Sequence, residues 1–181
     1  MRARIRNMVH DEPIATAAIA IAVSGMATIL GAWFFEYVLG YLPCPLCLEQ
    51  RTAYYISIPL AVLIAAGALA RWPRKLLAVG LAVIALSMLY NAGLGIYHSG
   101  VEWKWWTGPQ ACAAALGDLG SSDLLQRAQA TRIVRCDEAA WRFLGLSLAG
   151  WNVLISLALA AVATAGARAA SRPYGSSSVS Q

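Results

Sequence analysis

Two cysteines, Cys44 and Cys47, stand three positions apart in the stretch LPCPLCLEQR, and an arginine follows one helical turn later. Thiols at this spacing can form and break a disulfide or exchange with the thiols of another protein. Closing so short a loop yields little stabilisation, so a bridge between these two cysteines is suited to opening and closing. The chemistry predicted for this stretch is therefore thiol–disulfide exchange.

The residues around the pair predict a reactive thiol. Pro45 is suited to the first position of a helix, where its missing N–H costs nothing. Cys44 would then cap the helix, and Cys47 would lie in the first turn, where free N–H groups and the helix dipole stabilise a thiolate. Arg51 shares a helix face with Cys47, so its fixed charge can reach an anion or a carbonyl oxygen. The alternative is that Arg51 only extends from the helix end to the lipid headgroups.

The elements that carry these residues are apolar helices. Of the 181 residues, 59% are hydrophobic and only 13% are charged, whereas a soluble domain has about 25% charged residues. The excess lies in four runs of 19 to 22 residues without Asp, Glu, Lys or Arg: 14–35, 52–70, 76–97 and 146–167. Roughly 20 apolar residues cross a hydrocarbon core, and in lipid such a run must be helical. The sequence predicts an all-α membrane protein, a four-helix transmembrane bundle forming a single domain over residues 1–181.

Basic residues predict the orientation of this bundle. They gather before the first run, between the second and third, and after the fourth: Arg2, Arg4, Arg6, Arg71, Arg74, Lys75, Arg168 and Arg172. Short segments rich in Lys and Arg stay in the cytoplasm. Both termini are therefore predicted to be cytoplasmic, with loops 36–51 and 98–145 on the other side. The net charge of +5 does not indicate nucleic-acid binding, because these residues flank the runs.

The first run also has a second interpretation. Arginines before an apolar stretch are typical of a secretory signal peptide, but the apolar part of a signal peptide has about 7–15 residues. The first run has 22 residues, which favours a transmembrane helix that is retained.

All four cysteines fall in the two outer loops, Cys44 and Cys47 in the first, Cys112 and Cys136 in the second. An even number of cysteines in an oxidising compartment favours disulfides, although four cysteines allow three connectivities. The predicted bridges are Cys44–Cys47 and Cys112–Cys136. A zinc site is one alternative, but all-cysteine sites usually have two close pairs, so no metal is predicted. A structural bundle with two inert disulfides is another.

Three further segments carry expectations of their own. His98 lies just past the third run, where it can be an interfacial residue or a functional one. Residues 121–135 begin with capping serines and are predicted to form a short surface helix. The small, polar tail, residues 171–181, is predicted to be disordered.

The stretch PCPLCLEQR resembles the cysteine loop of the DsbB family of bacterial disulfide bond formation proteins, in which an arginine follows the second cysteine of Cys-x-x-Cys by four residues. GIYHSGVEW, residues 95–103, is similar to the family's exit from the third span. RCDEAAWRFLGLSLAGWNVL, residues 135–154, is similar to its entry into the fourth. The resemblance covers nearly the whole chain.

This resemblance implies a thiol oxidase in the bacterial inner membrane, with both cysteine loops in the periplasm. Such a protein reoxidises a thioredoxin-like, DsbA-like dithiol oxidase of the periplasm and passes the electrons to a membrane quinone, either ubiquinone or menaquinone. By matching position, Cys44 and Cys47 would be the pair near the quinone, and Cys112 and Cys136 would be the pair that faces the partner. From exchange chemistry we expect the partner to attack Cys112 first, and we expect Cys47, on the same helix face as Arg51, to donate the electrons to the quinone.

The resemblance also implies a quinone site. Arg51 matches the family's arginine implicated in quinone binding, and His98 matches a histidine near the same site. The loop before Cys112, WKWWTGPQA, departs from the family in its tryptophans, which bears on how the partner docks. An alternative within related chemistry is a quinone or quinone-epoxide reductase of the vitamin K type, which is also helical with four cysteines.

Overall fold

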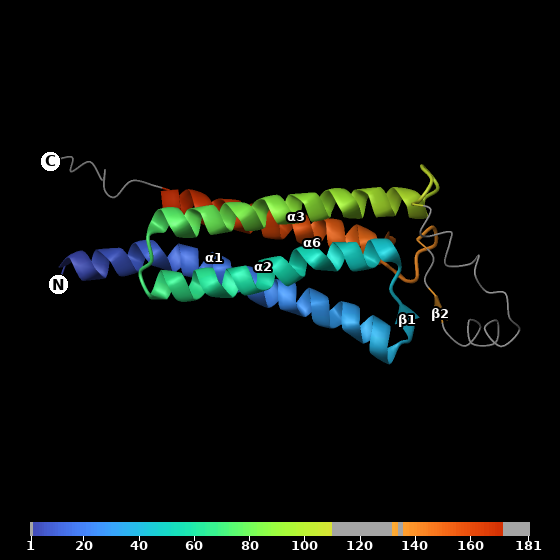
Figure 1. Ribbon diagram of the computed structural model, residues 1–181, viewed down its shortest axis with the longest axis horizontal. Helices are drawn as coiled ribbons and strands as arrows, with labels where there is room; N and C mark the ends of the chain where they lie inside the picture. The colour runs from blue at the N-terminus through green and yellow to red at the C-terminus, as the bar shows by residue number, and fades with distance from the viewer. Residues whose placement is uncertain (1, 110–131, 134–135, 172–181) are drawn as a thin grey trace, which may run out of the picture.

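The computed structural model describes residues 2–109, 132–133 and 136–171. In this part of the chain, long helices run side by side: α1 (Arg2–Trp33), α2 (Pro45–Leu69), α3 (Arg74–Glu102) and α6 (Leu148–Ser171) (Figure 1). These helices contain four candidate spans, each long and apolar enough to cross a membrane. The predicted four-helix bundle is therefore confirmed.

The bundle has two distinct ends. The start of α1, the link between α2 and α3, and the end of α6 lie together at one end, and strand β1 lies at the other (Figure 1). Helices α2 and α3 extend beyond their apolar runs by more than one turn, α2 at its start and α3 at its end. Thus α2 already begins at Pro45, and α3 continues to Glu102. The first cysteine loop therefore ends at Cys44, the second begins after Glu102, and His98 is helical.

Small residues allow the helices to approach closely. The most extensive contact is between α3 and α6, where a Cβ on Gly95 would lie 2.7 Å from Cγ2 of Val153. At Gly166 of α6, a Cβ would lie 3.0 Å from atoms of Ala17 and Leu81. Transmembrane helices associate through such close packing, since lipid offers no hydrophobic drive between them.

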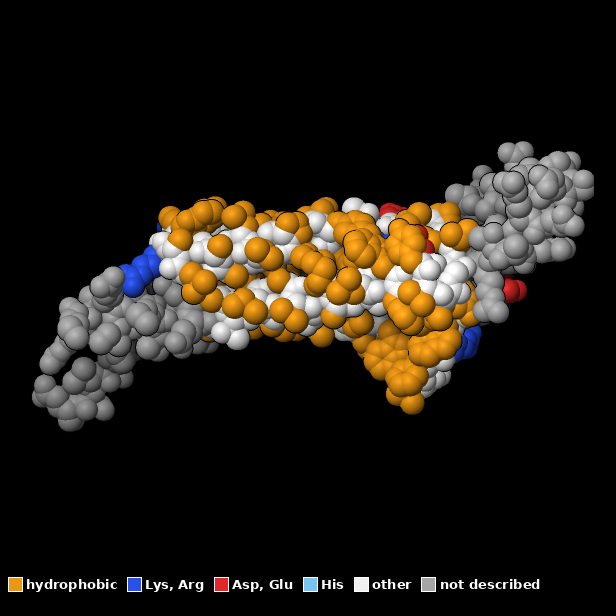
Figure 2. All heavy atoms as spheres, turned by 90° about the horizontal axis from the view of Figure 1, so that it is seen from below, with side chains coloured by type: hydrophobic (Ala, Val, Ile, Leu, Met, Phe, Trp, Pro, Cys, Tyr) orange, Lys and Arg blue, Asp and Glu red, His pale blue; other side chains and the backbone are white. Residues whose placement is uncertain are grey.

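The outer surface of the bundle is apolar. Figure 2 shows hydrophobic side chains over the length of the helices, with basic and acidic side chains toward the ends. Exposed large side chains occur on every long helix, among them Val23, Leu30, Val62, Val79, Leu86 and Leu157. A water-soluble monomer does not expose an apolar surface of this extent. The surface fits a lipid environment.

Strand β1 (Tyr41–Leu42) pairs in parallel with β2 (Arg132–Ile133), which joins the two outer loops. The first strand ends two residues before Cys44, and the second ends three residues before Cys136. This pairing therefore carries Cys136 toward the start of α2. The helix predicted for residues 121–135 is wrong at β2, and its other residues lie outside the described part, as do Cys112 and the tail from residue 172.

Two further local elements lie at the end of the bundle that carries β1. Helix α1 continues into a π-helix, η1 (Phe34–Val38), and a hairpin of β3 (Arg142–Phe143) and β4 (Leu146–Ser147) leads into α6. The turn residues Leu144 and Gly145 have φ values of 51° and 82°, as the common two-residue hairpin turn requires. Ser147 caps α6, because its Oγ accepts a hydrogen bond from the N–H of Gly150 at 3.1 Å.

Candidate functional site

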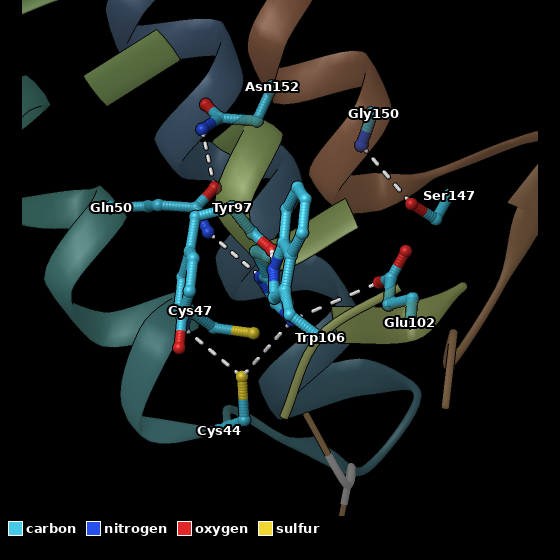
Figure 3. Close-up of polar contacts among 10 residues, drawn as sticks. Cys44, Cys47, Gln50, Tyr97, Glu102, Trp106, Ser147, Gly150 and Asn152 are labelled. Carbon is cyan, nitrogen blue, oxygen red and sulfur yellow. Dashed lines mark hydrogen bonds and ion pairs between the residues drawn. The ribbon is translucent and has the colours of Figure 1, made fainter. Parts of the chain in front are cut away.

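The first turn of α2 holds the cysteine pair. Cys44 is the N-cap, with its Sγ accepting a hydrogen bond from the backbone N–H of Cys47 at 3.2 Å, and Pro45 occupies the first helical turn (Figure 3). The predicted helix start at Pro45 is confirmed. Both cysteines are free thiols here, so the structure describes the dithiol form of the pair. The Cys44–Cys47 disulfide stays a prediction.

Cys136 lies in the same small core as Cys44. These two side chains are 1% and 2% exposed and cluster with Leu46 and Val101, while Cys47 packs at the edge. Cys136 is disulfide-bonded, and its predicted partner Cys112 lies outside the described residues. The structure thus brings a cysteine of the second loop to the pair of the first loop.

His98 reaches the pair from α3. Its side chain is 4% exposed, and its Nε2 lies 3.8 Å from Sγ of Cys44 and 3.9 Å from Oε1 of Glu102. On the other side of the ring, Nδ1 lies 2.9 Å from the amide nitrogen of Gln50. The histidine is therefore buried among the groups of the site.

Arg51 has a partner that sequence reasoning missed. Its guanidinium forms an ion pair with the carboxylate of Glu36 in η1, and these side chains are only 12% and 16% exposed. Because little water screens this pair, the attraction is stronger than at an open surface. Arg51 is thus fixed on the inner side of α2 and does not extend to the headgroups in this structure.

A cavity of about 320 Å³ opens beside the pair, between α1, α2 and α6. Cys47, Arg51 and His98 are among its lining residues, whereas Cys44 is not. Most of the remaining wall is apolar or aromatic, including Ile29, Phe35, Leu42, Leu148, Trp151 and Ile155. The two cysteines therefore face different neighbours: Cys47 faces the cavity, and Cys44 faces Cys136 and His98.

Comparison with known proteins places this chain in a family. Residues 15–166 match the family described as "Disulfide bond formation protein DsbB". The chain belongs to the DsbB family. It is 30% identical over 156 residues to a disulfide bond formation protein B of Albidiferax ferrireducens, covering 79% of this chain and 84% of that protein.

Other relatives show similar coverage. A disulfide bond formation protein B of Saccharophagus degradans is 30% identical over 154 residues, covering 80% of this chain and 87% of the relative. An uncharacterized protein of Rickettsia prowazekii is 29% identical over 147 residues, covering 78% of each chain. No solved structure matches the chain significantly. This member of the DsbB family is a multi-pass membrane protein of disulfide bond formation.

Cys44, which precedes the first residue of α2, is the acidic thiol of this DsbB-family site. Its pKa is lowered from 9.0 to about 5, chiefly by a hydrogen bond from the Cys47 side chain. Burial of the Cys44 thiol raises its pKa and so opposes that shift, whereas His98 and the backbone N–H of Cys47 support it. At neutral pH the reduced pair therefore holds a thiolate on Cys44, which shares a core cluster with Cys136.

We expect this thiolate to be lost as the pH falls through about 5. The sign follows from the lowered pKa, since the charged form is present above that pH and protonated below it. The Cys112→Ser/Cys136→Ser protein retains only the first pair, so its far-ultraviolet thiolate absorbance should show one thiolate at neutral pH. Replacing His98 with alanine should move the midpoint upward. A midpoint near 9 in the protein with His98 intact would contradict this assignment.

The polar residues around His98 were not singled out by sequence reasoning. Gln50 and Asn152 are joined by a hydrogen bond of 2.6 Å, and Tyr54 donates to Oδ1 of Asn152 at 2.7 Å. Asn91, which the sequence places in an apolar run, is 0% exposed and donates to Ser156 at 2.9 Å. A usable signal was present: polar side chains within transmembrane runs face the bundle interior and find partners there.

Proposed function

We propose that this chain is a quinone-dependent thiol oxidase that reoxidises a reduced periplasmic dithiol protein of the DsbA-like, thioredoxin-like class. The observation that carries the proposal is that the two cysteines of the pair have different surroundings. Cys44 clusters with Cys136, and Cys47 lines an apolar cavity together with Arg51. Electrons arriving at the second loop therefore have a route through Cys44 and Cys47 to the cavity.

The residues of the cavity fit a quinone. Small-molecule sites are mostly apolar clefts of about 300–1,000 Å³ with a few well-placed polar groups, and this cavity has about 320 Å³. Its polar groups include the guanidinium of Arg51, which can donate to a quinone oxygen. A quinone bound there supplies an acceptor for two electrons and two protons. Exchange between dithiol pairs is close to reversible, so such an acceptor gives the reaction its direction.

The protein's own steps follow from thiol–disulfide exchange. A thiolate of the reduced partner attacks the predicted Cys112–Cys136 bridge, at Cys112, and forms a mixed disulfide. The freed Cys136 either resolves that mixed disulfide or attacks the Cys44–Cys47 bridge, whose Cys44 sulfur lies in its own core cluster. In both cases two electrons reach the pair at the start of α2. Arg51 stabilises negative charge that develops at the cavity.

The proposal requires the cysteine end of the bundle to face an oxidising compartment. We propose that both termini are cytoplasmic and that the outer loops face the periplasm of a bacterial inner membrane. A reporter that is active only outside the cytoplasm should be silent when fused after Ala70 and active when fused near Ser121. The opposite pattern would place the cysteines among reducing thiols and defeat the mechanism.

Catalysis itself is tested with the purified protein in detergent. Addition of a reduced thioredoxin-like dithiol protein and ubiquinone or menaquinone should decrease the quinone absorbance, by one quinone for each dithiol oxidised. Oxidation of the dithiol protein without loss of quinone would exclude quinone as the acceptor. If the dithiol protein is not oxidised at all, the proposed function is wrong, and the two predicted disulfides are inert structural bridges.

Replacing Arg51 with glutamine should slow quinone reduction by about 100-fold, the usual effect of removing a donor from a developing negative charge. It should also raise the quinone KM. Replacing Glu36 with glutamine should have the opposite effect on KM, because it releases the guanidinium from its ion pair. Steady-state kinetics at varied quinone concentration measure both changes.

The controls separate Arg51 from the rest of the site. Exchange between the dithiol partner and the second loop should remain normal in Arg51→Gln, since that step does not involve the cavity. Arg51→Lys should restore activity only in part, because a flexible point charge does not replace a planar fork. Unchanged kinetics in Arg51→Gln at every quinone concentration would show that Arg51 has no role at the quinone.

A further inference from the structure

A line of hydrogen-bonded polar side chains runs from α6 to the cysteine pair. The Tyr54 hydroxyl donates to Oδ1 of Asn152 at 2.7 Å, and Nδ2 of Asn152 donates to Oε1 of Gln50 at 2.6 Å. Nε2 of Gln50 then lies 2.9 Å from Nδ1 of His98. Figure 3 shows Asn152, Gln50 and Cys44 along this line, which crosses from α6 through α2 to α3.

The line has a direction. An amide side chain presents oxygen on one side and nitrogen on the other, so the group that donates at one end determines every link that follows. Both Tyr54 and Nδ2 of Asn91, at 3.4 Å, donate to the oxygen of Asn152. In the structure Asn152 accordingly turns its nitrogen to Gln50, and Gln50 turns its own nitrogen to His98. Nδ1 of His98 accepts that hydrogen bond, which leaves the proton of the neutral ring on Nε2.

The protonated nitrogen faces Cys44. Nε2 lies 3.8 Å from Sγ of Cys44 and 3.9 Å from Oε1 of Glu102, in surroundings where His98 is 4% exposed. We infer that Gln50 and Asn152 are positioning residues that hold His98 as the Nε2–H tautomer, so that the neutral ring donates a hydrogen bond to the Cys44 thiolate. Because Nδ1 is occupied by Gln50, His98 stabilises this thiolate and is not the base that deprotonates it.

This inference deepens the proposed function. It rests on that function only for the role of the Cys44 thiolate, which is to re-form the disulfide with Cys47. When the reduced pair is reoxidised, a bond forms between the sulfurs of Cys44 and Cys47 and two electrons leave for the quinone. Two protons go with them, one from the Cys47 thiol and one from solvent, which replaces the proton already lost by Cys44. The hydrogen bond from His98 keeps Cys44 ready to form that bond.

The tautomer also decides whether the site binds a metal ion. The sulfurs of Cys44 and Cys47 and a ring nitrogen of His98 lie within 4.8 Å of one another, which is compatible with a soft metal ion. A ligand nitrogen must offer a lone pair, and its other ring nitrogen must then donate to an acceptor. In the tautomer inferred here, Nε2 carries a proton instead. Metal binding is therefore disfavoured unless the hydrogen bonds from Asn152 through Gln50 to His98 reverse their donors and acceptors.

Nitrogen-15 NMR of histidine tests the tautomer directly. The chain has two histidines, so His10→Gln leaves His98 as the only labelled ring, in a full-length protein without quinone. We expect a protonated Nε2 and an unprotonated Nδ1 in the reduced protein when the ring is neutral. A spectrum with the proton on Nδ1 would overturn the inference without bearing on quinone reduction.

Two acidic variants should reverse the line. In Gln50→Glu, the carboxylate only accepts, so Nδ1 must carry the proton. In Asn152→Asp, which is separated from His98 by Gln50, the carboxylate accepts from Tyr54 and from the Gln50 nitrogen, which turns the Gln50 oxygen to Nδ1. Both variants should move the proton to Nδ1 and raise the midpoint of Cys44 ionisation. Thr52→Ala, at an exposed position of α2, should change neither.

Cobalt binding gives a second measurement that a purely structural role would not produce. In the reduced Cys112→Ser/Cys136→Ser protein, added Co²⁺ should bind more tightly after Gln50→Glu, by about 10-fold or more, as for other carboxylate–histidine–metal groups. The sulfur-to-cobalt charge-transfer absorption reports this binding. Equal or weaker binding in Gln50→Glu, or an unchanged tautomer in Asn152→Asp, would show that the line does not control His98.

Discussion

Replacing Cys47 with serine should abolish quinone reduction while leaving the first exchange with the partner intact. Cys47 is the cysteine of the pair that lines the cavity, and the Cys44–Cys47 disulfide cannot form without it. The variant protein should oxidise at most one equivalent of the reduced dithiol partner, using the predicted Cys112–Cys136 bridge, and then stop. The protein with Cys47 intact should continue to turn over as long as quinone is supplied.

Mixing experiments with the partner in excess measure this difference. The dithiol consumed per protein is counted by thiol titration, and quinone loss is followed by absorbance. Thr52→Ala, one turn or so along the same helix and exposed, is the matched control and should behave as the parent does. Continued quinone reduction in Cys47→Ser would mean that electrons reach the cavity from another group, and the assignment of Cys47 would be wrong.

Replacing Cys136 with serine should trap the partner. If the partner attacks Cys112, the mixed disulfide is normally resolved by Cys136. The variant has no Cys112–Cys136 bridge to open, so a partner with a single active-site cysteine is supplied as its mixed disulfide with 5-thio-2-nitrobenzoate. The Cys112 thiolate displaces that small thiol and forms a disulfide with the partner, and without Cys136 the two proteins stay covalently joined. The structure supports this choice, because the Cys136 side chain is 1% exposed and lies in the core cluster that contains Cys44. A large partner cannot reach a sulfur buried in that way. Non-reducing gels should show a band with the combined mass that disappears on reduction.

The companion variant fixes the direction of attack. Cys112→Ser should give little or no trapped complex, since the remaining buried sulfur is not accessible to the partner. A complex that accumulates in Cys112→Ser and not in Cys136→Ser would show that Cys136 is the sulfur attacked. In that case the core cluster of Cys44 and Cys136 would have to open during each turnover, and amide hydrogen exchange at residues 44–47 should rise when the partner is added.

The sequence by itself determined the parts of this protein that depend on local chemistry. Four apolar runs specify helices, because lipid leaves the backbone no other way to satisfy its hydrogen bonds. The start of α2 was equally predictable, since Pro45 and the capping position of Cys44 act within one turn of chain. The motif around Cys47 and Arg51 also sufficed to suggest the family, which the comparison over residues 15–166 established.

Only the tertiary structure decided which side chains meet. His98 and Cys44 are 54 positions apart, and Gln50 and Asn152 are 102 positions apart. These contacts depend on how each helix is rotated about its own axis. In a soluble helix the apolar stripe reveals that rotation, but a helix in lipid is apolar on nearly every face, so composition does not mark the inner side.

The pairing of Arg51 with Glu36 was hidden for a related reason. Glu36 stands at the end of an apolar run, where a charge usually marks a membrane boundary, and nothing in the linear pattern turns it toward α2. The π-helical turn of η1 brings it there. The approach of Cys136 to Cys44 likewise rests on the parallel pairing of β1 and β2, each only two residues long. Strands of two residues show no alternation of polar and apolar side chains in the sequence. Their pairing therefore depends on how the whole cysteine-bearing end of the bundle packs.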